Sequence, residues 1–392
     1  RTVRTLERED FVIENVIFES RPNFPVTANL YIPCNADFPA PAVIVPSGHS
    51  LEGKASDYNQ AAAQLCARNG MVALAYDPIG QGERLQYPGG EDPQGQKVTW
   101  GTMQHNYIGN PQLLVGEFFG SWRAWDGMVA IDYLLTREEV DPTRIGVTGC
   151  SGGGTLTTLL TALERRLTMS APSCYVTSWR RDIENELAAD AEQMPPDAHA
   201  LLVGQHDLLL MNAPEALILL TAAEDFFDQR GARESYARIE HVYELLGAAD
   251  ALAYYVGPGG HGYPPAMRDA MAAHFCRAAG LPVVASMTTT SAMTSTGSMG
   301  GTEINQCGGA MGGMGNACYV YPGAPPTPGL VGADVTFNRG IYMDGCVTMD
   351  DGKTVTVWGF TDTANGGMGG GYQFPSPPIR VTEGQIVHTV LS

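Results

Sequence analysis

The sequence predicts an α/β fold, a doubly wound and mostly parallel sheet, followed by a Gly/Met/Thr-rich linker and a small β segment. Short apolar runs typical of buried strands alternate with helical patterns from the start of the chain to about position 280. One of these runs leads directly into a glycine-flanked serine, Ser151. The composition then changes abruptly at Ala285. We therefore expect a large domain over 1–282, a linker over 283–318 and a β unit over 319–392.

Length and charge narrow the classes of protein. The 392 residues suggest one large and one small unit, and a formal net charge of −19 argues against nucleic acid or an anionic membrane surface as a partner. No apolar run reaches the roughly 18 residues that a membrane span needs. The chain starts at Arg1 with no signal-like apolar segment, which is consistent with a processed mature chain but also with a start set by how the sequence was cut.

Strand and helix patterns follow one another in order. The stretch from Arg1 to Pro33 alternates apolar and polar side chains, as antiparallel strands of a half-exposed sheet do. A charged stretch over about 178–212 resembles a cap-like insertion, and the stretch over 85–116 reads as a long irregular loop. In the helix over 117–136, we expect a core face of Trp122, Trp125, Val129, Tyr133 and Leu134. The predicted buried strands are 42–45, 71–76, 145–148, 167–170, 216–221 and 252–256, and further helices are predicted over 58–68, 234–246 and 267–276.

Residues 149–153 read Gly-Cys-Ser-Gly-Gly and fit the pattern G-x-S-x-G, the nucleophile elbow. A strand pattern precedes the motif and a helical pattern follows it, as this strained turn requires. Ser151 is therefore the candidate nucleophile. The competing interpretation is a glycine-rich turn with an incidental serine.

Candidate partners for Ser151 lie downstream in the order acid, then histidine. His261 stands in a glycine-rich stretch after the last predicted strand, where a general base can reach the serine. Glu224, Asp225 and Asp228 follow the strand over 216–221 and compete for the role of the acid. We prefer Asp225, and the alternative for it is a helix-capping aspartate.

Two backbone N–H groups are candidates for an oxyanion hole. One belongs to His49, in the loop after the strand over 42–45, and the other to Gly152, directly after the serine. For His49 the alternative is a loop histidine whose ring only packs near the site.

With these pieces in place, the chain up to about position 280 resembles the α/β-hydrolase superfamily, and more closely its acetyl xylan esterase-like branch. The resemblance implies Ser151 as nucleophile, His261 as base and Asp225 as orienting acid, in a two-step acyl transfer on carbohydrate or small esters. Sibling branches include peptidases and dienelactone-type hydrolases. The matching segments are 47–50, 77–84, 125–127, 140–155, 171–175 and 260–263.

The C-terminal part resembles the opening of a multicopper-oxidase cupredoxin domain, through residues 351–360 and 375–384. Blue-copper sites need two histidines and a cysteine, and this region holds only His388. We therefore predict no metal and no cofactor. The methionines of the linker are interpreted as filler rather than as Cu(I) ligands.

The eight cysteines contain no C-x-x-C pair. Cys307 and Cys318 bracket a Gly/Met stretch, and a disulfide between them, or to Cys346, would hold it together. This favours a secreted, extracellular or periplasmic protein. Small buried or free thiols are the alternative.

Two functions from different classes follow. The first is a serine esterase with an accessory β module, with a serine peptidase of the same fold as a variant. The second is an assembly protein, in which the β segment pairs with neighbouring subunits by strand addition, as in a homo-oligomer.

Overall fold

A computed structural model describes residues 1–91, 98, 101–187, 189–193, 195–284, 339–348 and 354–362, the last two ranges as backbone only. The chain divides into two compact units. The larger unit contains a nine-stranded sheet with its helices, and the smaller contains a two-stranded sheet. The domain boundaries predicted from the sequence stay a prediction.

The large sheet has the strand order β1-β2-β3-β5-β4-β6-β7-β8-β9. Strand β1 pairs antiparallel with β2 and β3 pairs antiparallel with β5, whereas β5, β4, β6, β7, β8 and β9 run parallel. This confirms the predicted α/β class. The strands are β1 (Thr2–Glu7), β2 (Phe11–Arg21), β3 (Phe24–Pro33), β4 (Ala40–Pro46), β5 (Val72–Tyr76), β6 (Val140–Cys150), β7 (Leu167–Ser173), β8 (Ala216–Glu224) and β9 (Leu252–Gly260).

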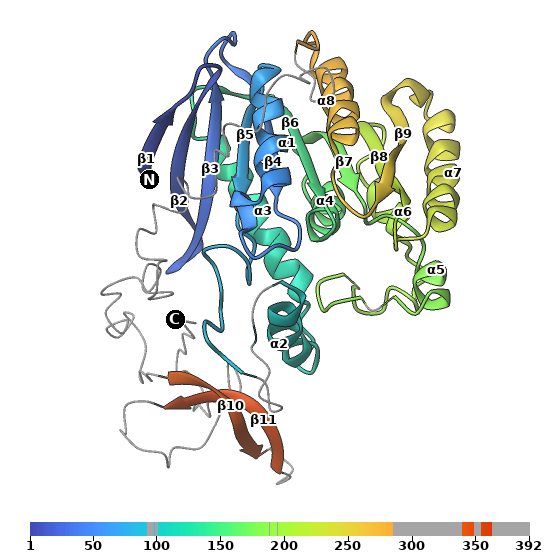
Figure 1. The fold of residues 1–392 in the computed structure, drawn as a ribbon. Helices are drawn as coiled ribbons and strands as arrows, with labels where there is room; N and C mark the ends of the chain where they lie inside the picture. Colours follow the sequence, from blue (N-terminus) through green and yellow to red (C-terminus); the bar gives the residue numbers. More distant parts are fainter. Residues whose placement is uncertain are drawn as a thin grey trace, which may run out of the picture. The chain divides into compact units, whose positions relative to one another are not determined.

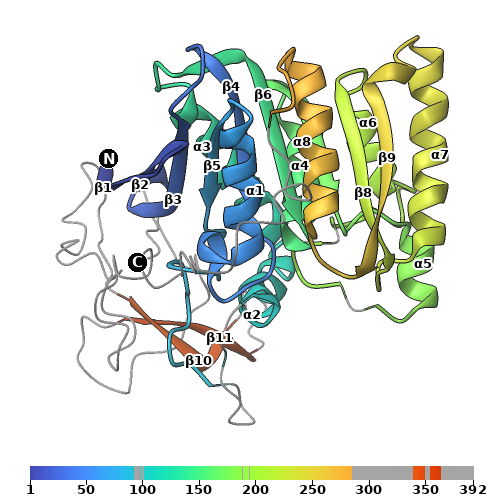
Figure 2. The same cartoon turned by 45° about the horizontal axis from the view of Figure 1, so that its top comes forward.

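Helices cover both faces of this sheet (Figures 1 and 2). Helices α1 and α8 pack together on one face, while α3, α4, α6 and α7 follow one another in contact on the other. The helices are α1 (Asp57–Arg68), α2 (Thr102–Leu113), α3 (Phe119–Leu134), α4 (Gly152–Leu163), α5 (Trp179–Glu184), α6 (Gln205–Leu210), α7 (Gln229–Leu245) and α8 (Pro265–Ala279), with short 3₁₀ turns η1 (Gly53–Ala55) and η2 (Ala249–Ala251).

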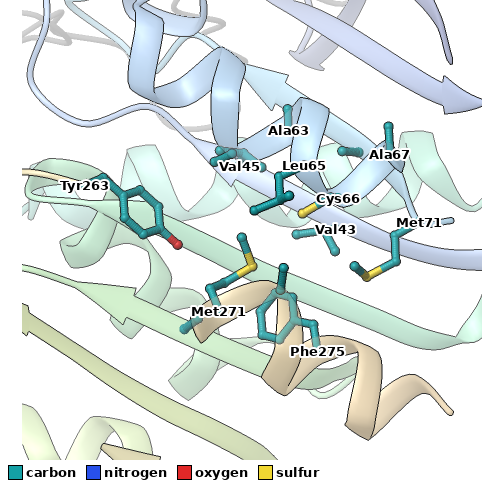
Figure 3. Close-up of a cluster of buried hydrophobic side chains, with 14 of the residues drawn as sticks. Val43, Val45, Ala63, Leu65, Cys66, Ala67, Met71, Tyr263, Met271 and Phe275 are labelled. Carbon is teal, nitrogen blue, oxygen red and sulfur yellow. The ribbon is translucent and has the colours of Figure 1, made fainter. Parts of the chain in front are cut away.

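The side chains of β4 show how one strand serves two cores. Successive residues of a strand point to opposite faces, so Val43 and Val45 join the cluster under α1 and α8, while Ala42 and Ile44 join the cluster under α3 and α4. Figure 3 shows the first cluster. A strand buried on both faces reads as a continuous apolar run, which is why the sequence predicted it.

Helix α3 differs from the prediction. Trp125 is 46% exposed, and the buried face carries Arg123 and Asp126 instead of the tryptophans. The buried charges are tolerated because they are paired, as in the 2.7 Å ion pair of Arg84 with Asp126. The prediction from apolar spacing is right for Leu134, which is buried, and wrong for Trp125, because the spacing cannot show which charged side chains meet partners.

The region over 85–116 contains a helix, α2, in place of the long loop that the sequence predicted. Its sequence is polar and includes Pro111, so apolar spacing gives no helical signal. Gln104, His105 and Gly109 are its buried residues. Contacts to the rest of the unit, rather than local periodicity, hold this helix. The insertion over 178–212 contains the short helices α5 and α6.

The smaller unit contains β10 (Arg339–Thr348) and β11 (Thr354–Asp362), which pair antiparallel from Arg339 opposite Asp362 to Thr348 opposite Thr354. The remainder of the predicted linker and of the cupredoxin-like segment, His388 included, lies outside the described residues.

Among the described side chains, Cys34, Cys66, Cys150, Cys174 and Cys276 are free thiols. The disulfide predicted among Cys307, Cys318 and Cys346 involves side chains outside the described set. Within the described part of the chain, no helix is long and apolar enough to cross a bilayer.

Candidate active site

The strand order reverses between β4 and β6. Helix α1 leads from β4 to β5 on one side, and the chain returns through α3 to place β6 on the other. In open α/β sheets, ligands bind beyond the carboxyl ends of the strands at such a reversal. The loop after β4 begins at Ser47, and the turn after β6 is Ser151.

Ser151 joins β6 to α4 with φ 60° and ψ −119°, a conformation that a residue with a side chain rarely adopts. Its N–H donates to the carbonyl of Ser173 at 2.9 Å, which holds the turn against the end of β7. A Cβ at Gly149 or at Gly153 would lie within 2.6 Å of the Pro46 carbonyl oxygen. The motif therefore needs glycine at these positions, and the geometry is that of a nucleophile elbow.

His261 directly follows β9, and its Nδ1 lies 2.8 Å from Oδ1 of Asp225, which directly follows β8. The same carboxylate oxygen accepts the N–H of Phe227 at 3.1 Å. Of the three competing acids, Asp228 instead caps α7 through the N–H of Arg230, and Glu224 is exposed. Asp225 is thus the acid that the structure brings to His261.

The loop that carries His261 is tied to the elbow strands. The Tyr263 hydroxyl bonds Thr148 Oγ1 of β6 at 2.8 Å, and the Cys174 thiol donates to the Gly262 carbonyl at 3.1 Å. Burial raises the pKa of the Tyr263 phenol, so the phenol remains neutral. These contacts connect the loop to Thr148, three residues before Ser151, and to Cys174, which follows the residue whose carbonyl accepts the Ser151 N–H.

Phe226 stacks on the ring of His261, with centroids 4.1 Å apart and 28° between the planes, although Phe226 itself is 51% exposed. The stack covers one face of the imidazole. An open hollow of about 450 Å³ lies beside it. Its lining comes from the insertion and from the stretch between the end of β8 and the start of α7: Asn185, Leu187, Ala223, Asp225, Phe226, Asp228 and Gln229.

The loop after β4 packs against the elbow. A Cβ on Gly48 would lie 2.2 Å from the Cys150 carbonyl oxygen, and a Cβ on Gly152 would lie 2.6 Å from Nε2 of His49. The structure therefore brings the two candidate N–H residues, His49 and Gly152, into contact. Gln81 holds the loop from behind by donating to the Gly48 carbonyl at 2.5 Å.

The ring of His49 faces a buried polar group that sequence reasoning missed. Its Nε2 lies 2.8 Å from Oε1 of Glu192 and 3.2 Å from Oδ2 of Asp190, both from the insertion. His105 of α2 approaches the same Asp190 oxygen through Nδ1 at 2.8 Å. We call these four side chains the histidine–carboxylate cluster. Only Asp190 and Glu192 are close in the sequence. His49 and His105 come from two other segments, so no motif links the four residues.

Burial sets the charges of this region. It lowers the pKa of His105 to about 3, and the nearby Arg123 guanidinium lowers it further. Burial acts to raise the pKa of the Asp190 carboxyl, but the hydrogen bonds from His105 and His49 outweigh this effect and hold that pKa below its usual value. Arg123 pairs with Glu192 and donates to Gln81 at 3.1 Å. The ring of His49 is thus linked through Glu192 to the buried guanidinium of Arg123.

Comparison with known proteins gives concordant results. Residues 4–193 match the family model "Acetyl xylan esterase (AXE1)", a span that includes Ser151 and ends before Asp225 and His261. YtaP of Bacillus subtilis (strain 168), which is named as a hydrolase, is 24% identical to this chain over 296 residues. The aligned residues make up 66% of this chain and 86% of YtaP.

Two solved structures are similar in fold. Methylesterase BT1017 has a TM-score of 0.53 at 22% identity, over 71% of this chain and 57% of that protein. The glucuronoyl esterase from Solibacter usitatus has a TM-score of 0.50 at 15% identity, over 70% of this chain and 84% of that one. The fold is that of the α/β hydrolases.

The fold, the elbow geometry and the family match together define the class of this protein: it is a carboxylic ester hydrolase. Within that class, the match over residues 4–193 supports the acetyl xylan esterase-like branch.

Proposed function

We propose that the chain is a serine esterase that hydrolyses esters of carbohydrates or of small alcohols, acetyl esters first among them. The observation that carries the proposal is the 2.8 Å hydrogen bond between His261 and Asp225, in the same unit as an elbow serine. A histidine held by a buried carboxylate is the arrangement that activates a serine hydroxyl.

The geometry supports the following roles. Because Nδ1 of His261 faces Asp225, its Nε2 is the nitrogen left to take the Ser151 proton as the hydroxyl attacks the ester carbonyl. The N–H groups of His49 and Gly152 would hold the oxyanion. His261 then gives its proton to the leaving alcohol, and water attacks the acyl-enzyme to release the acid and restore Ser151.

Charge favours a neutral substrate. The formal net charge of −19 repels polyanions such as pectic polymers, whereas an acetylated neutral sugar meets no such barrier. This supports acetylated neutral saccharides over partly methyl-esterified uronic acid polymers, whose free carboxylates keep them anionic.

Hydrolysis of p-nitrophenyl acetate by the intact chain, compared with Ser151→Ala, tests the proposal. A matched control is Ser121→Ala, which removes a hydroxyl at the exposed start of α3. We expect activity to vanish only in Ser151→Ala, and acetylated xylo-oligosaccharides to be cleaved faster than methyl-esterified polygalacturonate. Equal background rates in all three proteins would overturn the esterase, and peptide p-nitroanilides would then test the peptidase alternative.

A second candidate function is assembly through the C-terminal β unit. The observation in its favour is the two-stranded sheet of β10 and β11, because an isolated two-stranded sheet is marginally stable and gains from pairing with further strands. Sedimentation of the full chain and of a chain ending at Gly280 tests it. Concentration-dependent association that persists in the truncated chain would overturn this role.

We infer secretion, and the domain boundaries at about 282 and 318, from composition alone. Both can be checked on one sample. Non-reducing peptide mapping would reveal the predicted pairing among Cys307, Cys318 and Cys346, and limited proteolysis should cut between 283 and 318 first. Reduced thiols at all three positions would remove the argument for an oxidising compartment.

A further inference from the structure

The histidine–carboxylate cluster brings four metal-ligating atoms together from three separate segments. His49 follows β4, His105 lies on α2, and Asp190 and Glu192 belong to the insertion. The four donor atoms all lie within 4.8 Å of one another, and three of the four residues are buried. Two imidazole nitrogens and two carboxylate oxygens form a donor set that proteins use for zinc.

The distances suit one small ion. Nε2 of His49 lies 2.8 Å from Oε1 of Glu192 and 3.2 Å from Oδ2 of Asp190. Nδ1 of His105 lies 2.8 Å from the same Asp190 oxygen and 3.8 Å from the same Glu192 oxygen. Zinc bonds of about 2.0–2.1 Å imply tetrahedral edges of roughly 3.3 Å. These four histidine–carboxylate distances therefore lie within about half an ångström of a tetrahedral edge, and the two remaining donor pairs are no more than 4.8 Å apart.

Outer contacts hold three of the four ligands in orientation. Nε2 of His105 lies 3.1 Å from the Ile79 carbonyl oxygen, and Arg123 pairs with the second oxygen of Glu192. Oδ1 of Asp190 accepts the N–H of Glu192 at 3.2 Å. In each ligand one nitrogen or oxygen faces the cluster, and the second nitrogen or oxygen of the same side chain contacts a group outside the four donor atoms. Such outer contacts are usual around protein metal ligands.

Hydrogen bonding at His105 independently calls for a cation. A neutral imidazole carries one N–H. If that proton is on Nε2, facing the Ile79 carbonyl, then the lone pair of Nδ1 faces a carboxylate oxygen of Asp190 at 2.8 Å. If it is on Nδ1, the lone pair of Nε2 faces a carbonyl oxygen instead. A metal ion between Nδ1 and Asp190 removes the conflict, because it takes the Nδ1 lone pair and the carboxylate oxygen while the Nε2 N–H donates to the Ile79 carbonyl.

We propose that the histidine–carboxylate cluster binds one zinc ion. The ligands are His49 Nε2, His105 Nδ1, Asp190 Oδ2 and Glu192 Oε1. Four protein ligands leave no open position, so the site is structural rather than catalytic. The ion would tie α2 and the insertion to the loop after β4, and so fix the backbone N–H of His49. Only this last consequence rests on the proposed esterase function.

Metal analysis of the full chain is the direct test. After incubation with ZnCl2 and gel filtration, elemental analysis should find about one zinc per chain, as a closed four-ligand site predicts. Asp190→Asn keeps the size of the side chain and should lose the zinc, as should His105→Ala. The control His206→Ala removes a histidine of α6, outside the cluster, and should retain it. Substitution by Co²⁺ should give the visible absorption of a tetrahedral site in wild type and in His206→Ala only.

A chelator supplies the readout on stability. Removal of the ion with dipicolinate should lower the melting temperature, and ZnCl2 should restore it in wild type but not in Asp190→Asn. Zinc content near zero in wild type, with no shift of melting temperature on ZnCl2 addition, would overturn the site and leave a protonated hydrogen-bonded cluster. Ser151→Ala separates the two proposals, because it should bind zinc normally while lacking esterase activity.

Discussion

Nδ1 of His261 lies 2.8 Å from Oδ1 of Asp225, although helix α7 and strand β9 separate the two in the chain. The parallel pairing of β8 with β9 places both residues at one edge of the sheet, with Glu224 opposite Gly260. The buried carboxylate, with Oδ2 lacking a hydrogen-bond partner among the described residues, has His261 as its principal partner. The following experiments depend on this pair and its surroundings.

Asp225→Asn should lower kcat on p-nitrophenyl acetate by about 10²–10⁴-fold, because the amide can no longer hold the imidazole in the productive tautomer. Circular dichroism and the melting temperature should stay close to wild type, since the side chain keeps its size. The matched control is Glu224→Gln, an exposed neighbouring acid that should keep nearly full activity. Loss of activity in Glu224→Gln with retention in Asp225→Asn would reverse the assignment.

Gly152→Ala should reduce kcat/KM by about 10²–10³-fold, the usual loss for one oxyanion donor. The new Cβ would lie 2.6 Å from Nε2 of His49, so the ring must move, and we expect its displacement to disturb the loop that carries the His49 N–H. Gly260→Ala is the control next to the same site, because the nearest atom to its new Cβ is the Glu224 carbonyl oxygen at 3.7 Å. We expect the control to stay within a few fold of wild type in a steady-state assay. An unimpaired Gly152→Ala enzyme would exclude this arrangement of the oxyanion loop.

Phe226→Leu should lower kcat by about 2- to 10-fold, which corresponds to the energy of one aromatic stack. Phe226 is a positioning residue, since its contact is with the ring of His261. Its exposed side chain contributes little to the core, so the melting temperature should not change. Phe226→Tyr should restore kcat because it restores the stacked ring. A loss confined to KM would show instead that the side chain contacts substrate.

Asp182 predicts a pH-dependent stability. Burial raises its pKa to about 7, and the nearby Asp228 raises it further. In the unfolded chain this carboxyl ionises near its ordinary value of about 3.9. Between these two values the folded state holds one more proton than the unfolded state. The free energy of unfolding should therefore fall as pH rises from about 4 to about 7, by at most roughly 1.4 kcal/mol per pH unit.

Asp182→Asn should flatten that slope and raise the stability of the protein at pH 7 and above. Urea unfolding at several pH values measures both quantities. Glu186→Gln changes an exposed carboxylate in the same insertion and should leave the slope as it is. If the stability of Asp182→Asn follows the wild-type curve at every pH, then Asp182 is ionised in the folded protein.

Local sequence determined much of this protein. The apolar runs of β4 and β5 and the glycines around Ser151 specify buried strands and a strained turn through residues adjacent in the chain, so the sequence alone predicts them. The candidate positions of His261 and Asp225 followed because chain order fixes which strand ends share an edge of a parallel sheet. The choice of Asp225 over Asp228 rests on the tertiary contact with His261, since both acids follow β8 closely.

Tertiary structure decided the rest. Helix α2 has no apolar period, and the buried face of α3 carries Arg123 and Asp126 because partners from distant loops pair with them. The histidine–carboxylate cluster likewise joins segments up to 143 residues apart, from His49 to Glu192. A polar residue is predicted to be exposed unless its hydrogen-bond or ion-pair partner is known, because a polar side chain is buried at low cost only when it is paired. Pairing of polar groups across long separations is therefore what the sequence alone left undetermined.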